Sequence, residues 1–117
     1  MVPKTKNPRC DRGNSAFGAR CGESASAYLD YFFDALAQGA ISLGLTEEQA
    51  KSYVLSMAKG TIALIEETKK DPLVLGKEVC SPGGSTMEGV HVMIENGLYE
   101  MMGKAVEATY RKNQKMC

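Results

Sequence analysis

The sequence carries no net charge, because 14 Lys and Arg residues balance 14 Asp and Glu residues. Bulk electrostatics therefore gives no reason to expect a nucleic-acid partner or an anionic lipid surface. No apolar run approaches the ~20 residues that a membrane-spanning helix needs. The N-terminus also lacks the apolar stretch of a secretory signal. We therefore expect a cytoplasmic protein with no membrane part and no nucleic-acid partner.

Metal-binding and disulfide patterns are also missing. The four cysteines are scattered at Cys10, Cys21, Cys80 and Cys117, and none forms a C-x-x-C pair. His91 is the only histidine, so a zinc site is not expected. Since nothing directs the chain to an oxidising compartment, we interpret the cysteines as reduced thiols.

Strand patterns are absent as well, since no run of β-branched residues alternates with polar ones. No Gly-x-Gly-x-x-Gly motif occurs, which is the fingerprint of a dinucleotide-binding Rossmann domain. The sequence therefore predicts an all-α domain, with no Rossmann domain in this chain.

Two regions differ sharply in character. Residues 1–23 are polar and interrupted by prolines and glycines, with neither a helical nor a strand period, and are interpreted as a disordered or atypical N-terminal arm. From about Ser24 the sequence becomes strongly apolar, and residues 24–117 are predicted to form one helical domain. The first helix of that domain is apolar on nearly every side and is expected to end at Gly44 as a C′ glycine. A helix of this kind must be covered all round, so we expect an intertwined homodimer.

Local signals divide residues 24–117 into about five helices, the first helix included. Thr46 to Gln49 form a capping box, and Asp71-Pro72 marks a break before a short helix. A second capping box is predicted at Ser85 to Glu88, with the helix ending at Asn96-Gly97. This helix is expected to turn its apolar side inward, including His91, and a last helix follows from Leu98.

The segment from Ser81 to Thr86, Ser-Pro-Gly-Gly-Ser-Thr, carries the most chemical information. Its two glycines form a turn that leads directly into a helix N-terminus, where backbone amides have no internal partner and the dipole favours an anion. Such a turn is suited to a carboxylate or a phosphate, and the Thr86 hydroxyl adds one hydrogen-bonding group. The alternative is an ordinary turn in which Ser85 only caps the helix.

The segment Ser-Pro-Gly-Gly-Ser-Thr, followed by Gly-Val-His-Val-Met-Ile-Glu-Asn-Gly-Leu, resembles the C-terminal signature of pyrroline-5-carboxylate reductases. Tyr28 to Gly44 is similar to the first dimerisation helix of that family, Ala58 to Thr61 to the middle of its second, and Lys104 to Thr109 to its last. The resemblance covers about Tyr28 to Met116.

This resemblance implies a proline-biosynthesis oxidoreductase, in which NAD(P)H reduces 1-pyrroline-5-carboxylate to proline and a helical domain dimerises and completes the substrate site. By the family pattern, the substrate carboxylate is held by amides of the loop, and the substrate-binding residues are Ser81, Gly83, Gly84, Ser85 and Thr86. The Thr86 hydroxyl is the implied catalytic group, meeting the ring nitrogen. The implied partners are further copies of the chain, as a homodimer or a higher oligomer of dimers, and pyrroline-5-carboxylate or proline. NAD(P)H is not expected to bind this chain alone.

Two departures from the family pattern leave alternatives open. The family reads Gly-Pro-Ala-Tyr before its first helix, whereas this chain reads Ala25-Ser26-Ala27-Tyr28, and residues 1–21 do not resemble the family. Without a cofactor domain, the chain could also be a stand-alone helical dimer or an inactive remnant that acts as an interaction module.

Overall fold

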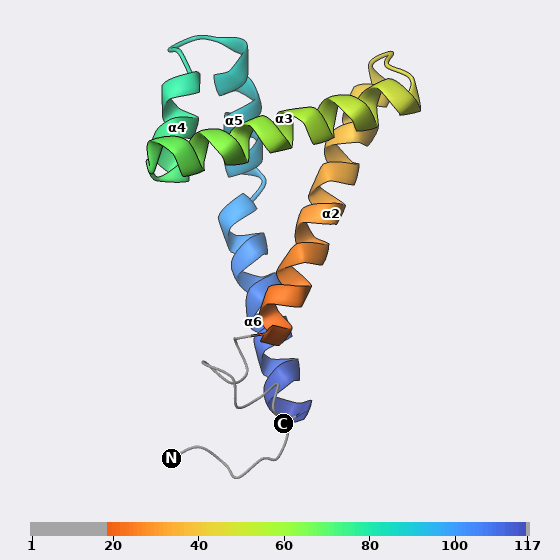
Figure 1. The fold of residues 1–117 in the computed structure, drawn as a ribbon, viewed down its shortest axis with the longest axis vertical. Coiled ribbons are helices and arrows are strands. Elements are labelled where there is room, and N and C mark those ends of the chain that lie inside the picture. The colour runs from red at the N-terminus through yellow and green to blue at the C-terminus, as the bar shows by residue number, and fades with distance from the viewer. Residues whose placement is uncertain (1–18, 117) are drawn as a thin grey trace. The chain divides into compact units, whose positions relative to one another are not determined.

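The computed structural model describes residues 19–116 and the side chains of residues 24–115, and this part of the chain is helical with short connections (Figure 1). The helices are α2 (Ala19–Ser42), α3 (Glu47–Thr68), α4 (Pro72–Val79), α5 (Ser85–Glu95) and α6 (Leu98–Met116). The all-α prediction is confirmed. Helix α2 begins earlier than Ser24, so residues 19–23 of the predicted arm are helical, and the remainder of that arm lies outside the described residues.

The chain divides into two compact units, and α2 contributes to both. The first unit contains the start of α2 up to Tyr31 and helix α6, whereas the second contains residues 32–96. In the first unit, the Tyr28 hydroxyl donates a hydrogen bond to the Ala105 carbonyl oxygen at 3.1 Å and is hydrogen-bonded to the Thr109 hydroxyl. These two hydrogen bonds link the start of α2 to α6.

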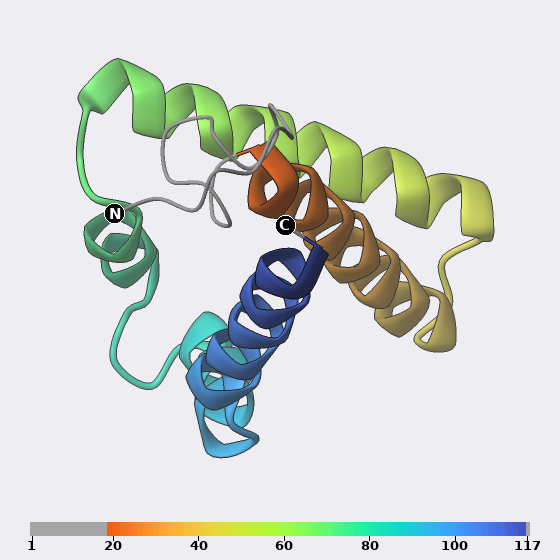
Figure 2. The same ribbon diagram turned by 90° about the horizontal axis from the view of Figure 1, so that it is seen from below.

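The second unit has a small apolar core where the end of α2 meets the start of α3 (Figure 2). Ala37, Ala50 and Val54 are buried there, and Phe33 and Ile41 pack against them. Small residues at two of the three positions allow the two helices to approach closely.

The turn between α2 and α3 follows the signals in the sequence. Gly44 has a φ of 123°, its N–H donates to Ile41 O at 3.0 Å, and the N–H of Leu45 donates to Ala40 O at 3.2 Å. This pair of bonds is the Schellman arrangement that ends a helix, so the prediction for Gly44 is confirmed.

The predicted stop at Asn96-Gly97 is confirmed too, because α5 ends at Glu95 and Gly97 has a φ of 80°. None of the described helices combines the length and the apolar character needed to cross a membrane.

Candidate functional site

The loop between α4 and α5 is built around a tight turn. The Gly84 N–H donates to the Ser81 carbonyl oxygen at 2.9 Å, and Gly83 between them has a φ of 75°. A turn with positive φ at its third residue favours glycine there, and proline suits the second position, which Pro82 occupies. The backbone hydrogen bond and the conformational preferences of Pro82 and Gly83 together define this turn.

Gly84 must be small for a different reason. A Cβ atom at this position would lie 2.7 Å from the Ser81 hydroxyl oxygen and 3.1 Å from the Ser81 carbonyl oxygen. The second atom belongs to the backbone and cannot move aside without opening the turn. Gly84 therefore owes its identity to close packing rather than to its backbone angles, which are ordinary at φ −82° and ψ 167°.

The start of α5 differs from the prediction. Gly84 is the N-cap, no side chain makes a capping hydrogen bond, and the helix begins at Ser85. The predicted capping box of Ser85 and Glu88 is therefore wrong. A capping box needs Ser or Thr at the N-cap and Glu or Gln at the third helical position. The turn instead places Ser85 first in the helix and Glu88 fourth, where the Glu88 N–H already approaches Gly84 O at 3.4 Å.

The consequence is a helix start with open backbone donors. The first N–H groups of a helix have no acceptor within the helix, and here no side chain replaces one. Ser85 and Thr86 at this helix start are both exposed residues. The helix dipole adds a partial positive charge at the same point. This arrangement can bind a carboxylate or another small anion.

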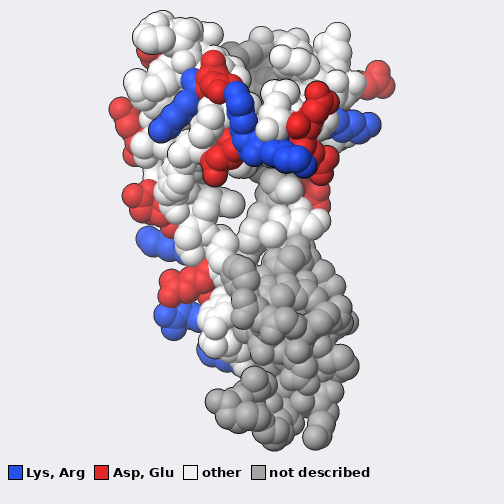
Figure 3. Space-filling model, turned by 60° about the vertical axis from the view of Figure 1, so that its left-hand side comes forward, with Lys and Arg blue, Asp and Glu red and all other residues white. Residues whose placement is uncertain are grey.

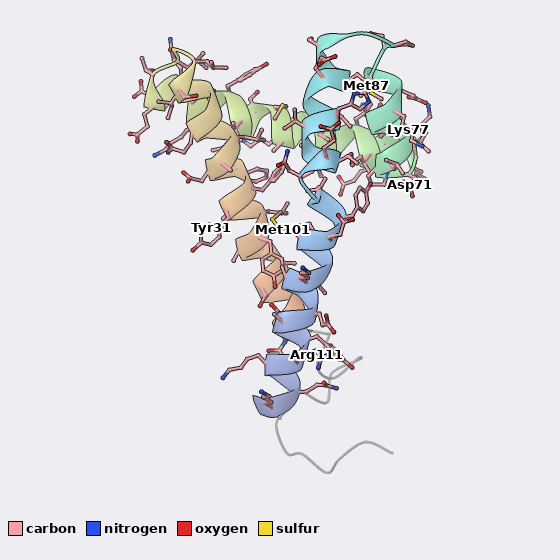
Figure 4. The ribbon with its side chains drawn as sticks, turned by 180° about the vertical axis from the view of Figure 1, so that it is seen from behind. Tyr31, Asp71, Lys77, Met87, Met101 and Arg111 are labelled. Carbon is pink, nitrogen blue, oxygen red and sulfur yellow. The ribbon has the colours of Figure 1, made fainter. Side chains whose placement is uncertain are left out.

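The structure brings the predicted site residues Ser81, Gly83, Gly84, Ser85 and Thr86 together in one short segment. Gly84 differs from the others because its N–H is already bonded to Ser81 O. The donors that remain for a ligand are therefore the amides of Ser85 and Thr86, and we call them, with the Thr86 hydroxyl, the cradle. Met87 lies on the side of α5 that faces α4 (Figure 4), where it is half-buried.

His91, which follows the cradle on α5, is not packed as predicted. His91 is exposed on α5, although its place in the apolar pattern predicted an inward orientation. Ile94, predicted on the same side, also keeps 48% of its surface exposed. Met87 and Val90, the other two residues predicted on this side, are half-buried, so the described part of the chain covers the apolar face of α5 only in part.

One contact near the site has no local signal in the sequence. Lys70, in the connection before α4, forms an ion pair with Glu78 in the last turn of α4, with Nζ and Oε2 2.9 Å apart. The two residues are separated by the Asp71-Pro72 break, so helical spacing could not have predicted their contact.

Apolar side chains remain exposed on every helix. Tyr31 at 79%, Tyr53 at 63% and Val79 at 67% are among them, whereas Ala37, Ala50 and Val54 are the only buried apolar residues in the described part of the chain. Figure 4 shows Tyr31 pointing away from the ribbon, and Figure 3 shows basic and acidic side chains interspersed on one face with uncharged surface between them. Isolated soluble domains rarely expose so much apolar surface.

An open apolar pocket of about 200 Å³ lies within the second unit. Phe33, Ala37, Val54 and Leu55 line it, together with the charged residues Asp34 and Lys51. Its lining offers no pair of polar groups comparable to the amides at the start of α5.

Comparison with known proteins points to one family. The family described as pyrroline-5-carboxylate reductase dimerisation matches residues 14–116, a span that begins inside the predicted arm. A pyrroline-5-carboxylate reductase of Synechocystis is 37% identical over 93 residues, covering 80% of this chain and 35% of the relative. The Escherichia coli enzyme of the same name is 32% identical over 93 residues, again covering 80% of this chain and 35% of the relative.

The solved structures agree with this result. The crystal structure of a Plasmodium falciparum pyrroline carboxylate reductase with NADP bound is similar to this chain with a TM-score of 0.82 and 26% identity. The similarity covers 86% of this chain and 38% of that protein. The chain thus spans roughly a third of the length of the reductases it matches.

Proposed function

This chain belongs to the pyrroline-5-carboxylate reductase dimerisation family, and on that premise we propose that it forms the dimer contact and holds the substrate carboxylate in such a reductase. The proposed reaction reduces the C=N bond of 1-pyrroline-5-carboxylate to give proline. The observation that carries the substrate part of the proposal is the uncapped start of α5 at Gly84.

The proposed partner is a second copy of the chain. Leu29, Phe32 and Leu36 on α2 keep 40% or more of their surface exposed, on a helix whose other face already packs on α3. Covering these side chains in a dimer would stabilise it by roughly 25 cal/mol for each Å² of apolar surface removed from water. A core of three small or medium side chains is too little to hold a domain of this size, so we propose that the homodimer is obligate.

Sedimentation velocity over a range of concentrations tests the dimer. We expect one dimeric species at micromolar concentration, with unfolding that accompanies dissociation on dilution. A folded monomer at nanomolar concentration, with the same far-ultraviolet circular dichroism as the concentrated sample, would contradict the proposal.

In the proposed substrate complex, each part of the cradle has one task. The amides of Ser85 and Thr86 donate to the two carboxylate oxygens, helped by the dipole of α5. The Thr86 hydroxyl forms a hydrogen bond with the ring nitrogen, which orients the C=N bond. A carboxylate held at one end and a ring nitrogen held beside it leave the ring with a single orientation.

The hydride donor in the proposed reaction would be a reduced nicotinamide nucleotide, which would supply a hydride to the imine carbon, and a proton on the ring nitrogen would complete the amine of proline. The residues of this chain do not fit such a cofactor, because its 117 residues contain no Gly-x-Gly-x-x-Gly motif. We therefore assign no cofactor-binding residue here and confine the chain's task to dimerisation and substrate orientation.

Calorimetric titration with three ring compounds tests the substrate part. Proline carries both the carboxylate and the ring nitrogen, cyclopentanecarboxylate lacks the nitrogen, and pyrrolidine lacks the carboxylate. We expect proline to bind weakly, cyclopentanecarboxylate more weakly still, and pyrrolidine not at all. Equal binding of proline and pyrrolidine would show that the carboxylate is not the group recognised.

A further inference from the structure

The connection before α4 has a well-defined backbone. Lys69 ends α3 in the left-handed region with a φ of 57°, and the Thr68 hydroxyl donates to Leu64 O at 2.8 Å. The Lys70 N–H then donates to the same hydroxyl at 3.3 Å, and the Asp71 carboxylate accepts from the Leu73 N–H at 2.9 Å. Lys70 therefore projects from a backbone that is held on both sides, which lowers the entropy lost when its side chain forms an ion pair.

The Lys70–Glu78 ion pair joins the two ends of α4. Lys70 stands before the helix, and Glu78 lies in its last turn, with the charged atoms 2.9 Å apart and the side chains 48% and 51% exposed. Its charges are the reverse of what the dipole of α4 favours, since a helix is stabilised by anions at its start and cations at its end. Stabilising α4 through its dipole therefore does not explain the pair.

Glu78, one member of the pair, lies close in sequence to the cradle. The Cys80 N–H donates to Lys77 O at 3.1 Å, so the last turn of α4 leads directly into the Ser81–Gly84 turn. A shift at the end of α4 would thus be carried through two hydrogen-bonded turns to Ser85 and Thr86.

We propose that Lys70 and Glu78 are positioning residues, which hold the end of α4 so that the turn presents the amides of Ser85 and Thr86 to a carboxylate. This inference rests on the proposed function of the cradle. Neither side chain is required to touch the ligand.

The test compares dissociation constants of proline and sulfate for the full chain and four variants, from amide shifts of Ser85 and Thr86. Lys70→Met and Glu78→Gln each break the pair, and the double variant K70E/E78K restores it with the charges exchanged. Arg111→Met is the matched control, because it removes an exposed ion pair with Glu107 of 2.7 Å on α6. Exposed pairs contribute little, so we expect roughly two- to fivefold weaker binding in each single variant. The exchanged pair should restore binding, and the control should bind like the unchanged chain.

An electrostatic role and a positioning role of Glu78 predict opposite effects of Glu78→Gln on sulfate binding. If the pair acted only by its electric field, removing this carboxylate would strengthen sulfate binding, and the effect would be larger for the dianion than for zwitterionic proline. Loss of positioning weakens both ligands by a similar factor. Tighter sulfate binding by E78Q, or unchanged binding by both single variants, would overturn the inference while leaving the cradle itself intact. Absence of any shift in the unchanged chain would instead contradict the proposed function, and this inference with it.

Discussion

Helices α3 and α5 begin with similar sequences, Thr-Glu-Glu-Gln and Ser-Thr-Met-Glu, yet their first turns are built differently. At α3 the Thr46 hydroxyl accepts from the Gln49 N–H and the Gln49 side chain accepts from the Thr46 N–H, both at 3.1 Å. At α5 the N-cap is Gly84, and no side chain caps the helix. One helix start is closed by its own side chains, and the other is open.

The difference lies in the residues that come before each helix. The Ser81–Gly84 turn fixes Gly84 in extended conformation, so the helix has begun by the time the chain reaches Ser85. At the capped start of α3, side chains of Thr46 and Gln49 already accept from the first N–H groups, and Glu47 and Glu48 add negative charge there. An open start keeps donors for a ligand. The contrast shows that a Ser-x-x-Glu sequence leaves the helix start uncapped when the preceding turn places another residue at the N-cap.

The largest effect is expected from Gly84→Ala, which would disrupt the open start. The new Cβ would lie 3.1 Å from Ser81 O and 2.7 Å from the Ser81 hydroxyl, so the turn must open and displace the amides. We expect proline binding to weaken by more than about tenfold, which corresponds to about 1.4 kcal/mol. Gly76→Ala on α4 is the control, because nothing lies within 4 Å of its added methyl group. Unchanged affinity in Gly84→Ala would show that the turn does not position the donors.

The next largest effect is expected at the closed start. Thr46→Ala removes one half of the capping box, and we expect the free energy of unfolding to fall by about 1 kcal/mol. Denaturant unfolding at a fixed protomer concentration measures it, since dimerisation makes stability depend on concentration. A loss below a few tenths of a kcal/mol would mean that the two helix starts are not distinguished by their caps.

Thr86→Val keeps the shape of the side chain and removes its hydroxyl, and its effect on binding is expected to be smaller than that of Gly84→Ala. Binding of proline should weaken by roughly 0.5–1.5 kcal/mol, because one hydrogen bond to the ring nitrogen is lost. Binding of sulfate, which has no ring nitrogen, should stay the same. Equal losses for both ligands would place the hydroxyl on the anion rather than on the nitrogen.

The smallest effect is expected from Ser85→Ala. Ser85 is exposed and makes no cap, so its loss should change the free energy of unfolding by less than about 0.5 kcal/mol. The same denaturant experiment compares it directly with Thr46→Ala. A loss as large as that of Thr46→Ala would show that Ser85 caps α5 after all.

The fold could be predicted from the sequence where local signals decide it. Gly44, Thr46, Asp71-Pro72 and Gly97 all mark helix ends that the structure has in the same places, because each acts through bonds within a few residues. The predicted capping box at Ser85 is wrong because a bond outside the four-residue pattern decides where the helix begins. Its outcome depends on a hydrogen bond from Gly84 to Ser81, outside the four residues that define the pattern.

Non-local features could not be predicted in the same way. Helical periodicity identified the apolar sides of α3 and α5, but it cannot say which surface covers them, and Tyr53 and Ile94 remain 63% and 48% exposed. The Lys70–Glu78 contact depends on how the chain turns at Lys69, which has a left-handed conformation that lysine seldom adopts. The two glycines before a predicted helix start already indicated an anion-binding turn, whereas the substrate and the role of the Thr86 hydroxyl came only from the resemblance to a family motif.

The most direct test of the open start is a titration of the full chain with proline and with sulfate, followed by amide chemical shifts in one NMR spectrum. The two helix starts then serve as site and internal control under identical conditions. We expect saturable shifts at Ser85 and Thr86 and none at Glu47, Glu48 and Gln49. Silence at Ser85 and Thr86, or equal shifts at both helix starts, would contradict the account.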